Sequence, residues 1–580
     1  MAGKIGIGNQ DFATIRKEGC FYIDKTYFIR DWWESGDNVT LITRPRRFGK
    51  TLNMSMLDYF FSVKHAGKSE LFEGLSIWED ETYRNLQGTY PVISLSFANV
   101  KESDYRGARQ SMNRIIEDVY NKNNFLLDSN LLSENEKDYF RSVTFDMEDG
   151  VATWALHKMT DFLSRYYGKK VILLLDEYDT PMQEAYMSGY WSELVAFIRN
   201  LFHSTFKTNP YLERAIMTGI TRVSKESIFS DLNNLKVVTV TSEKYEDSFG
   251  FTEKEVFAAL DKFGLSDQKK LVKEWYDGFS FGKMTDIYNP WSIVSFLDEK
   301  RIGIYWANTS SNSLAGKLIQ VGSSEIKMTM ERLLRGESFK TTLDEQIVFS
   351  QLDMEGAHSG GDTAVWSLLL ASGYLKVVHY EFNISRRKAE FELKIPNLEV
   401  QVMFEQMIQR WFVRCDRVKN AFLEALLTCD IKGMNTYMNK VALQSFSYFD
   451  TGKHPSEEEP ERFYHGFVLG LMVELAGRYT VTSNRESGFG RYDVMLEPRS
   501  EEDDAIILEF KVQEEGEREL SDTVREALGQ IERKRYQEAL TAKGIPEERI
   551  RKYGFAFCGK KVLIGTEEGY ENYRSSHTKF

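Results

Sequence analysis

Val39-Thr40-Leu41-Ile42-Thr43-Arg44-Pro45-Arg46-Arg47-Phe48-Gly49-Lys50-Thr51 is the stretch that decides the fold. An apolar run leads into a short loop, and a helix-like stretch begins at the Gly-Lys-Thr that closes the loop. In a phosphate-binding loop, backbone N–H groups surround the phosphates, the Lys reaches the β- and γ-phosphates and the hydroxyl holds Mg²⁺. The helix dipole also favours an anion there. We therefore expect six residues to bind a nucleotide: Arg46, Arg47, Phe48, Gly49, Lys50 and Thr51.

The general motif opens on a glycine, whereas this loop opens on Arg44. That position often uses the backbone freedom of glycine, so the motif alone leaves the loop geometry open. A second element supports the site: the apolar run Val171–Leu175 ends in Asp176 and Glu177. We expect Asp176 to hold Mg²⁺ together with Thr51, and Glu177 to polarise a hydrolytic water. A plain buried strand capped by acids is the weaker alternative, given the order of the two motifs.

Apolar runs and helix-like stretches alternate over residues 1–241, which predicts a mostly parallel α/β sheet. One strand runs into Thr218-Gly219-Ile220-Thr221-Arg222, where polar groups could sense a γ-phosphate and Arg222 could meet developing charge. A turn stabilised by Thr hydroxyls fits this stretch equally well. The expected strands are Val39–Thr43, Tyr90–Ser96, Lys170–Leu175, Arg214–Thr218 and Leu235–Thr241, and the expected helices are Lys50–Val63, Tyr105–Asn121, Val151–Tyr167 and Ser192–Lys207.

Three segments of this region together resemble the bacterial AAA-ATPase-like family, over roughly residues 5–240. They are Phe21–Thr26, Thr43–Thr51 and Leu175–Asp179. The family's loop typically opens with Arg-Pro-Arg-Arg-Phe-Gly-Lys, so Arg44 is ordinary within it. The resemblance implies a P-loop fold that binds ATP and Mg²⁺, with Mn²⁺ as an alternative ion. It leaves open whether ATP is hydrolysed or only bound.

Further along the chain, residues 242–345 look helical and are expected to form a lid that follows the ATPase core. Its expected helices are Thr252–Phe263, Ser266–Trp275, Pro290–Leu297 and Glu325–Leu334. Residues 346–461 are expected to form a mostly helical connector with one hairpin. The acidic, Pro-containing loop Gly452–Glu461 marks the last boundary, and residues 462–580 form a final α/β domain.

A second set of chemical groups lies in that final domain. Glu509 and Lys511 are two residues apart in an apolar strand, so they point to the same face. Asp493 ends an earlier strand, across an acidic turn. Cutting a phosphodiester with metal needs carboxylates that converge on one or two Mg²⁺ ions. We expect Asp493 and Glu509 to be metal ligands, and Lys511 to lie beside the attacking water.

This segment resembles the PD-(D/E)xK nuclease module that is commonly fused to the ATPase-like family. The likeness covers about residues 462–567 and rests on Tyr464–Phe467, Ser483–Ser487, Gly490–Asp493 and Glu509–Lys511. Tyr492 replaces the Pro of the formal motif, a position that varies in the superfamily. Glu486 is either an extra acid near the metal or a surface carboxylate. His465 is interpreted as a packing residue rather than a base, because the mechanism requires no His.

Composition sets further bounds. A chain of 580 residues is too long for one core, so two to four domains are expected. The net charge of −13 does not favour nucleic-acid binding over the whole surface, although residues 525–561 carry ten Lys and Arg against five acids. That run is equally consistent with a solvated helix face. Four scattered Cys and no apolar run long enough to span a membrane predict a cytoplasmic protein without membrane contact.

The fold class is therefore α/β: a P-loop NTPase domain with a parallel sheet, a helical lid and connector, and a C-terminal PD-(D/E)xK nuclease-like domain. The favoured function is an ATPase coupled to a Mg²⁺-dependent endonuclease, with nucleic acid, expected to be DNA, as partner. The alternative is a nucleotide-dependent switch or scaffold that binds nucleic acid or a partner without cleaving it. Formation of a homo-oligomer is left open.

Overall fold

The computed structural model divides the chain into two compact units. Unit 1 comprises residues 1–320 and 336–403, and unit 2 comprises residues 321–335 and 404–580. The structure describes residues 4–221, 228–229, 232–306, 315–316, 318–319, 324–334, 336–343, 361–383, 388–413, 416–445, 472, 475, 477–483, 486–487, 490–491, 494–500, 502–513, 517–558 and 561–566. None of the helices in these ranges is long and apolar enough to cross a membrane.

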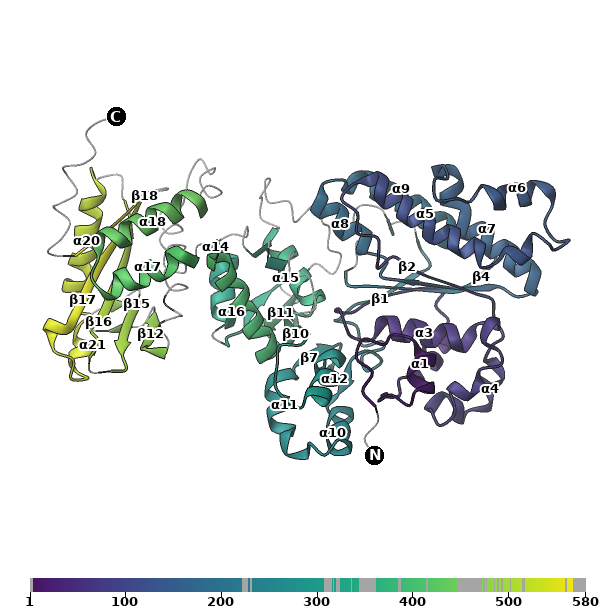
Figure 1. Cartoon of the computed structure of the whole chain (residues 1–580), viewed down its shortest axis with the longest axis horizontal. Helices are drawn as coiled ribbons and strands as arrows, with labels where there is room; N and C mark the ends of the chain where they lie inside the picture. Colours follow the sequence, from purple (N-terminus) through teal and green to yellow (C-terminus); the bar gives the residue numbers. More distant parts are fainter. Residues whose placement is uncertain are drawn as a thin grey trace. The chain divides into compact units, whose positions relative to one another are not determined.

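Unit 1 is built on a five-stranded, all-parallel sheet with the order β2-β3-β4-β1-β5. The sheet confirms the predicted parallel α/β fold, and β1 and β3 are buried along their whole length, as their apolar runs require. Helices α5, α7 and α9 cover one face, while α1, α3 and α4 lie on the other (Figure 1). The strands are β1 Val39–Thr43, β2 Val92–Ser96, β3 Val171–Asp176, β4 Leu212–Gly219 and β5 Leu235–Val238.

The four predicted helices of this part, α3, α5, α7 and α9, begin and end close to the predicted residues, whereas α1, α2, α4, α6 and α8 were not predicted. Two of the predicted elements, Val39–Thr43 and Tyr105–Asn121, have the predicted bounds. The helices are α1 Phe12–Lys17, α2 Tyr27–Glu34, α3 Lys50–Phe61, α4 Glu81–Leu86, α5 Tyr105–Asn121, α6 Glu134–Ser142, α7 Asp149–Tyr167, α8 Thr180–Ser188 and α9 Trp191–Phe206.

The region expected to be a helical lid is only partly helical. Its expected helices are present as α10 Glu253–Lys262, α11 Lys269–Tyr276, α12 Pro290–Glu299 and α14 Ser324–Leu334. Among them lies a three-stranded antiparallel sheet, β6-β8-β7, which the sequence analysis missed. Its strands, β6 Phe251–Thr252, β7 Phe279–Phe281 and β8 Met284–Tyr288, are two to five residues long. Strands this short carry too little periodicity to be recognised.

The predicted hairpin is present in the remainder of unit 1 as the antiparallel pair β10 Lys376–Asn383 and β11 Lys388–Lys394. A third strand, β9 Phe339–Thr341, pairs with β11. Helix α15 Gly361–Ala371 precedes the hairpin, and α16 Leu398–Val413 follows it. Residue 403 is the last of unit 1, so α16 begins in unit 1 and ends in unit 2.

Unit 2 is built on the sheet β12-β15-β16-β17-β18, in which only β16 and β17 are parallel. Side chains alternate along β16: Ile506, Leu508 and Phe510 join a core with α17 and α18, while Ala505 and Ile507 face α20. Helices α17 and α18 fall in the segment predicted to be a connector, whereas in the structure they pack on this sheet. The elements are α17 Asp416–Leu427, α18 Ile431–Ser445, β12 Tyr479–Ser483, β13 Glu486–Ser487, β14 Gly490–Arg491, β15 Val494–Pro498, β16 Ala505–Val512, α20 Leu520–Lys534, α21 Glu538–Thr541, β17 Ile550–Cys558 and β18 Lys561–Gly565.

Candidate active sites

The loop between β1 and α3 obtains its tight turn without a glycine at its first position. Its left-handed residues are Arg47, with φ 66°, and Gly49, with φ 85°, which caps α3. Glycine adopts this conformation without steric cost, so Gly49 is used where the backbone needs it. The substitution of Arg44 for the motif's first glycine therefore leaves the turn intact.

Arg44 has a structural role beneath the loop. Its guanidinium is fully buried, lies 4.7 Å from the ring centre of Phe281, and donates to the carbonyls of Thr43 at 2.9 Å, Thr239 at 2.7 Å and Tyr245 at 3.2 Å. Burial lowers the pKa of Arg44 to about 9, so the side chain keeps its charge at neutral pH. Arg44 thus ties the phosphate loop to the chain that follows β5.

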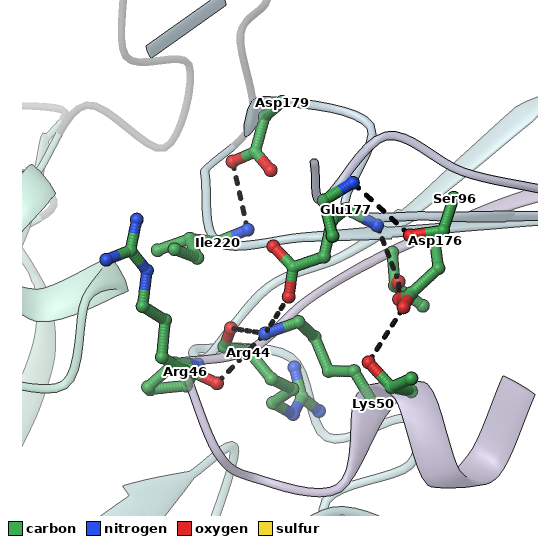
Figure 2. Close-up of polar contacts among 12 residues, drawn as sticks. Arg44, Arg46, Lys50, Ser96, Asp176, Glu177, Asp179 and Ile220 are labelled. Atoms are coloured by element: carbon green, nitrogen blue, oxygen red, sulfur yellow. Dashed lines mark hydrogen bonds and ion pairs between the residues drawn. The ribbon is translucent and has the colours of Figure 1, made fainter. Parts of the chain in front are cut away.

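Lys50 points back into the loop that carries it. Its ammonium donates to the carbonyl oxygens of Arg44 and Pro45, both at 3.1 Å, and lies 3.5 Å from Oε1 of Glu177 (Figure 2). The residue is only 3% exposed. A buried ammonium that meets a loop of backbone groups is the arrangement expected for contact with the phosphates of a nucleotide.

Asp176 and Thr51 come together as predicted for a metal site. The hydroxyl of Thr51 donates to Oδ2 of Asp176 at 2.7 Å, and the hydroxyl of Thr218 donates to Oδ1. Burial raises the pKa of Asp176, and the neighbouring Glu177 carboxylate raises it further. A hydroxyl and a carboxylate are hard oxygen ligands that suit Mg²⁺, which binds through few protein groups and keeps several waters. These residues fit the expected ion.

Thr218 and Thr221 bond to acids at the end of β3. The hydroxyl of Thr221 donates to Asp179 at 3.0 Å, as the hydroxyl of Thr218 does to Asp176. For the stretch that begins at Thr218, these bonds favour the alternative in which Thr hydroxyls stabilise the turn. Arg222, the other candidate of this stretch, lies outside the described residues.

A cavity of about 390 Å³ opens beside the loop. Its size falls in the range of small-ligand sites. Arg46, Arg47, Gly49, Lys50, Thr51 and Glu177 line it. So do residues from segments that the sequence analysis did not assign to the site: Gly6, Gly8, Asn9, Gln10, Tyr22, Ile23, Pro290 and Trp291. The sequence stretch Tyr288–Trp291 is interpreted from its aromatic residues as a packing feature, yet Trp291 reaches the cavity.

The other loop residues expected to bind the nucleotide differ in what their side chains do. The guanidinium of Arg47 lies 4.3 Å from the ring centre of Trp291, and Nη2 of Arg46 donates to Gln183 at 3.3 Å. The ring of Phe48 is fully buried against Phe279 and Phe281, at centroid distances of 5.0 and 5.3 Å. Any contact of Phe48 with a ligand therefore uses its backbone, as the motif's backbone N–H groups do.

In unit 2, Glu509 is 1% exposed and lies on the face of β16 that α20 covers. Nε2 of Gln530 on α20 donates to Oε1 of Glu509, and Oη of Tyr536 lies 3.4 Å from the same amide nitrogen. Lys511 shares this face and is half-buried. From the sequence, Gln530 and Tyr536 are expected on a basic helix that follows the Glu-x-Lys motif, but no local pattern links them to Glu509.

Asp493, Tyr492 and His465 lie outside the described residues, and for Glu486 only the backbone in β13 is described. The convergence of Asp493 and Glu509 therefore stays a prediction. Val494 of β15 pairs with Leu508 of β16. Asp493 thus comes one residue before this pair in the sequence, and Glu509 one residue after it.

The basic stretch 525–561 is largely paired with acids. Seven of its cations form ion pairs, which fits the reading as a solvated face. The pairs are Arg525–Asp522, Arg533–Glu526, Arg535–Glu538, Lys543–Glu497, Arg549–Asp504, Arg551–Asp504 and Lys552–Glu532.

A further acidic group lies in unit 1, away from the phosphate loop. Carboxylate oxygens of Glu253, Asp277 and Asp286 lie within 4.8 Å of one another. The ammonium of Lys273 contacts Glu253 and lies 3.8 Å from Asp277 and 3.5 Å from Asp286. Burial and the Asp286 carboxyl raise the pKa of Asp277 to about 7. Because the ammonium of Lys273 already contacts these carboxyl groups, we do not assign a metal to them.

Comparison with known proteins agrees with this geometry. Residues 6–229 match the family described as "Predicted AAA-ATPase", and residues 459–567 match the PD-(D/E)XK nuclease superfamily. An uncharacterized protein in the vnfD 5' region of Azotobacter chroococcum mcd 1 is 25% identical over 554 residues, which cover 94% of this chain and 95% of that protein.

Two solved structures show weaker similarity. One is a Drosophila ORC complex bound to AT-rich DNA and Cdc6, with 9% identity and a TM-score of 0.17, and the match covers 68% of this chain and 93% of that one. The other is the Aeropyrum pernix ORC2 protein, with 9% identity and a TM-score of 0.21, and the match covers 66% of this chain and 92% of that one. Similarity at this level supports no functional assignment. The family matches identify the domains: the chain joins an N-terminal domain that matches the predicted AAA-ATPase family to a C-terminal domain that matches the PD-(D/E)XK nuclease superfamily.

Proposed function

We propose that the chain binds and hydrolyses ATP in unit 1 and cuts DNA with a Mg²⁺-dependent site in unit 2, under control of the bound nucleotide. The observation that carries the proposal is the hydrogen bond from the Thr51 hydroxyl to Oδ2 of Asp176, at 2.7 Å, beside a buried Lys50 that faces Glu177. Lys50 and Thr51 begin α3, while Asp176 ends β3 and Glu177 follows it. Together these four groups supply the parts that phosphoryl transfer requires.

In the ATP site, Lys50 would exchange its loop carbonyls and Glu177 for β- and γ-phosphate oxygens. Once Lys50 has left Glu177, the Glu177 carboxylate would be free to orient the attacking water and to accept a proton from that water. Thr51 and Asp176 would hold Mg²⁺, which neutralises charge on the phosphates when bound. Arg46 and Arg47 add positive charge at the cavity, so the site favours a triphosphate over a less charged ligand.

In the nuclease site, Asp493 and Glu509 would hold the divalent ion, which supplies Lewis-acid stabilisation of the scissile phosphate when bound. The carboxylate of Glu509 is buried and oriented by Gln530. A carboxylate in this setting has few rotamers to lose on binding metal, so it suits a fixed ligand. Lys511, on the same face, would orient the attacking water.

Control of cutting by ATP has a physical route within unit 1. The indole N–H of Trp306 donates to the carbonyl of Arg46 at 3.0 Å. The backbone N–H groups of Tyr305 and Trp306 both donate to Oε1 of Glu399 at 2.7 Å. Glu399 lies in the first turn of α16, the helix that continues into unit 2. A shift of the phosphate loop would thus act on the start of this helix.

The test uses the full-length protein and two variants, Glu177→Gln and Glu509→Gln. ATP hydrolysis is measured as phosphate release, and DNA cutting as conversion of supercoiled plasmid in Mg²⁺ or Mn²⁺. We expect Glu177→Gln to lose hydrolysis and Glu509→Gln to lose cutting while it keeps hydrolysis. Plasmid that stays intact with the wild-type protein in both ions would contradict the nuclease part of the proposal.

A further inference from the structure

Asp179 is a fully buried carboxylate three residues beyond the metal-site Asp176. Its Oδ2 accepts a hydrogen bond from the backbone N–H of Ile220 at 3.0 Å (Figure 2). It also accepts from the backbone N–H of Thr221 at 2.9 Å and from the Thr221 hydroxyl at 3.0 Å. Bonds from backbone N–H groups to a buried carboxylate are strong and directional. Asp179 therefore fixes residues 220 and 221, which directly follow β4.

Gln183 extends this network toward the phosphate loop. It lies one helical turn after Asp179, and its Nε2 donates to Oδ2 of Asp179 at 2.9 Å. Because the amide nitrogen is used there, the amide oxygen faces the other way, where it accepts from Nη2 of Arg46 at 3.3 Å. One side chain thus links a fully buried carboxylate to a guanidinium that lines the cavity.

Arg46 is also held at its backbone. Its carbonyl accepts from the indole N–H of Trp306 at 3.0 Å and from Nδ2 of Asn289 at 3.4 Å. Main chain and side chain are therefore restrained by elements that are far apart in the sequence. The neighbouring Arg47 differs, because its guanidinium stacks on Trp291 instead. Of the two arginines that line the cavity, Arg46 is the one that a polar network orients.

We propose that Asp179 and Gln183 are positioning residues that hold Arg46 as an internal arginine, which meets the negative charge on the transferring phosphate. The inference rests on the proposed ATP hydrolysis and adds two residues outside the phosphate-loop motif. An arginine already held in place costs no reorganisation when charge develops. In related chemistry an arginine supplied within the same chain accelerates phosphoryl transfer by several orders of magnitude.

The same network joins Asp176, the last residue of β3, and Asp179 beyond it to the end of β4 and the two residues that follow it. Thr218 contacts Asp176, the expected metal ligand, and residues 220 and 221 contact Asp179. A change at the metal would therefore reach Arg46 through the loop after β4, Asp179 and Gln183. The network accounts for the burial of a carboxylate that the reaction itself does not use.

The experiment compares Arg46→Ala, Gln183→Leu and a matched control, Gln87→Leu. Gln87 is a buried amide of unit 1 and, like Gln183, forms two hydrogen bonds; it donates to the carbonyls of Tyr59 at 3.2 Å and His65 at 2.9 Å. We expect Arg46→Ala to lower kcat for ATP by about 100-fold or more, and Gln183→Leu by about 10-fold, with Kd for ATP changed by less than about 5-fold in both. Gln87→Leu should keep kcat.

A second readout separates positioning from general destabilisation. Added guanidinium ion should restore part of the activity of Arg46→Ala, and it should leave Gln87→Leu unchanged. Equal kcat in wild-type protein and Arg46→Ala, or loss that appears only in Kd, would overturn this inference while the proposed ATPase stands. A wild-type protein that binds ATP and does not hydrolyse it would overturn the proposed function, and the inference with it.

Discussion

The ammonium of Lys50 lies 3.5 Å from the carboxylate of Glu177, and these are the two residues expected to contact the phosphate and the attacking water. Glu177 reaches this position from a left-handed backbone conformation, with φ 51°. A non-glycine residue in this conformation is held there by its surroundings. The pair shows that the chain orients its two chemical groups toward the same point of the cavity.

Replacing Glu177 tests both members of that pair. In Glu177→Gln the carboxylate that competes with phosphate for Lys50 is lost, so we expect ATP to bind about 3- to 10-fold more tightly. Hydrolysis should fall by about 100-fold or more, because the general base is gone. Equilibrium binding of a fluorescent ATP analogue and phosphate release measure the two effects. Glu193→Gln, at an exposed glutamate of α9, serves as control. Hydrolysis at the wild-type rate would show that Glu177 is not the base.

Arg44 offers a test of the loop's architecture. Replacing it with the glycine of the general motif should not improve the site, because it removes a buried cation and leaves carbonyls without donors. We expect Arg44→Gly to destabilise unit 1 by about 1 to 3 kcal/mol for each carbonyl left buried without a donor. Hydrogen exchange of the amides of β1 and β5 measures this loss within unit 1. Unchanged protection of both strands, together with ATP binding as tight as in the wild type, would contradict the structural role.

Much of unit 1 follows from local sequence. The run Val39–Thr43 is buried throughout, and the amphipathic pattern of Tyr105–Asn121 gives a helix with the predicted bounds. The motif also places Thr51 against Asp176, since strand ends of a parallel sheet meet at one edge. These features depend on residues close in sequence or on a rule that applies to every such sheet.

The remaining features depend on contacts that no local pattern encodes. Asn289 and Trp306 both bond to Arg46, although more than 240 residues separate them from it. Arg44 departs from the general motif by residue type, and only its burial among carbonyls shows what it does. Gln530 likewise follows Glu509 by 21 residues, and the two meet only because α20 folds back on β16.

Gln530 should matter to cutting through Glu509. Gln530→Leu removes the donor that orients the Glu509 carboxylate, so we expect metal-dependent plasmid cleavage to fall by about 10- to 100-fold. The variant should need more Mg²⁺ for half-maximal rate, and ATP hydrolysis should stay at the wild-type level. Gln537→Leu, just beyond α20, is the matched control. Cleavage that falls without any change in the Mg²⁺ requirement would argue against a role in metal binding.

Asp277 predicts a pH effect on the stability of unit 1. Its pKa in the folded protein, about 7, lies above the usual value near 4, so folding favours the protonated form. Its contribution to stability is therefore complete below about pH 4 and is lost as the pH rises through about 7. Relative to Asp277→Asn, the free energy of unfolding of the wild-type protein should fall by about 2 kcal/mol between pH 4 and pH 8.

Urea unfolding of both proteins at several pH values, in EDTA and followed by exchange of the amides of α11 and β8, measures this difference. Exposed Asp267 lies nearby in unit 1, and its Asn variant is the control. Parallel stability profiles for wild type and Asp277→Asn would contradict the raised pKa.

The measurement that tests the central claim most directly is plasmid cutting by the wild-type protein and by Lys50→Ala, each with Mg²⁺ and with or without ATP. The two-site account predicts that ATP changes the wild-type cutting rate by about 5-fold or more and leaves Lys50→Ala unaffected. A cutting rate that is the same in all four conditions would show that unit 2 acts without reference to the nucleotide.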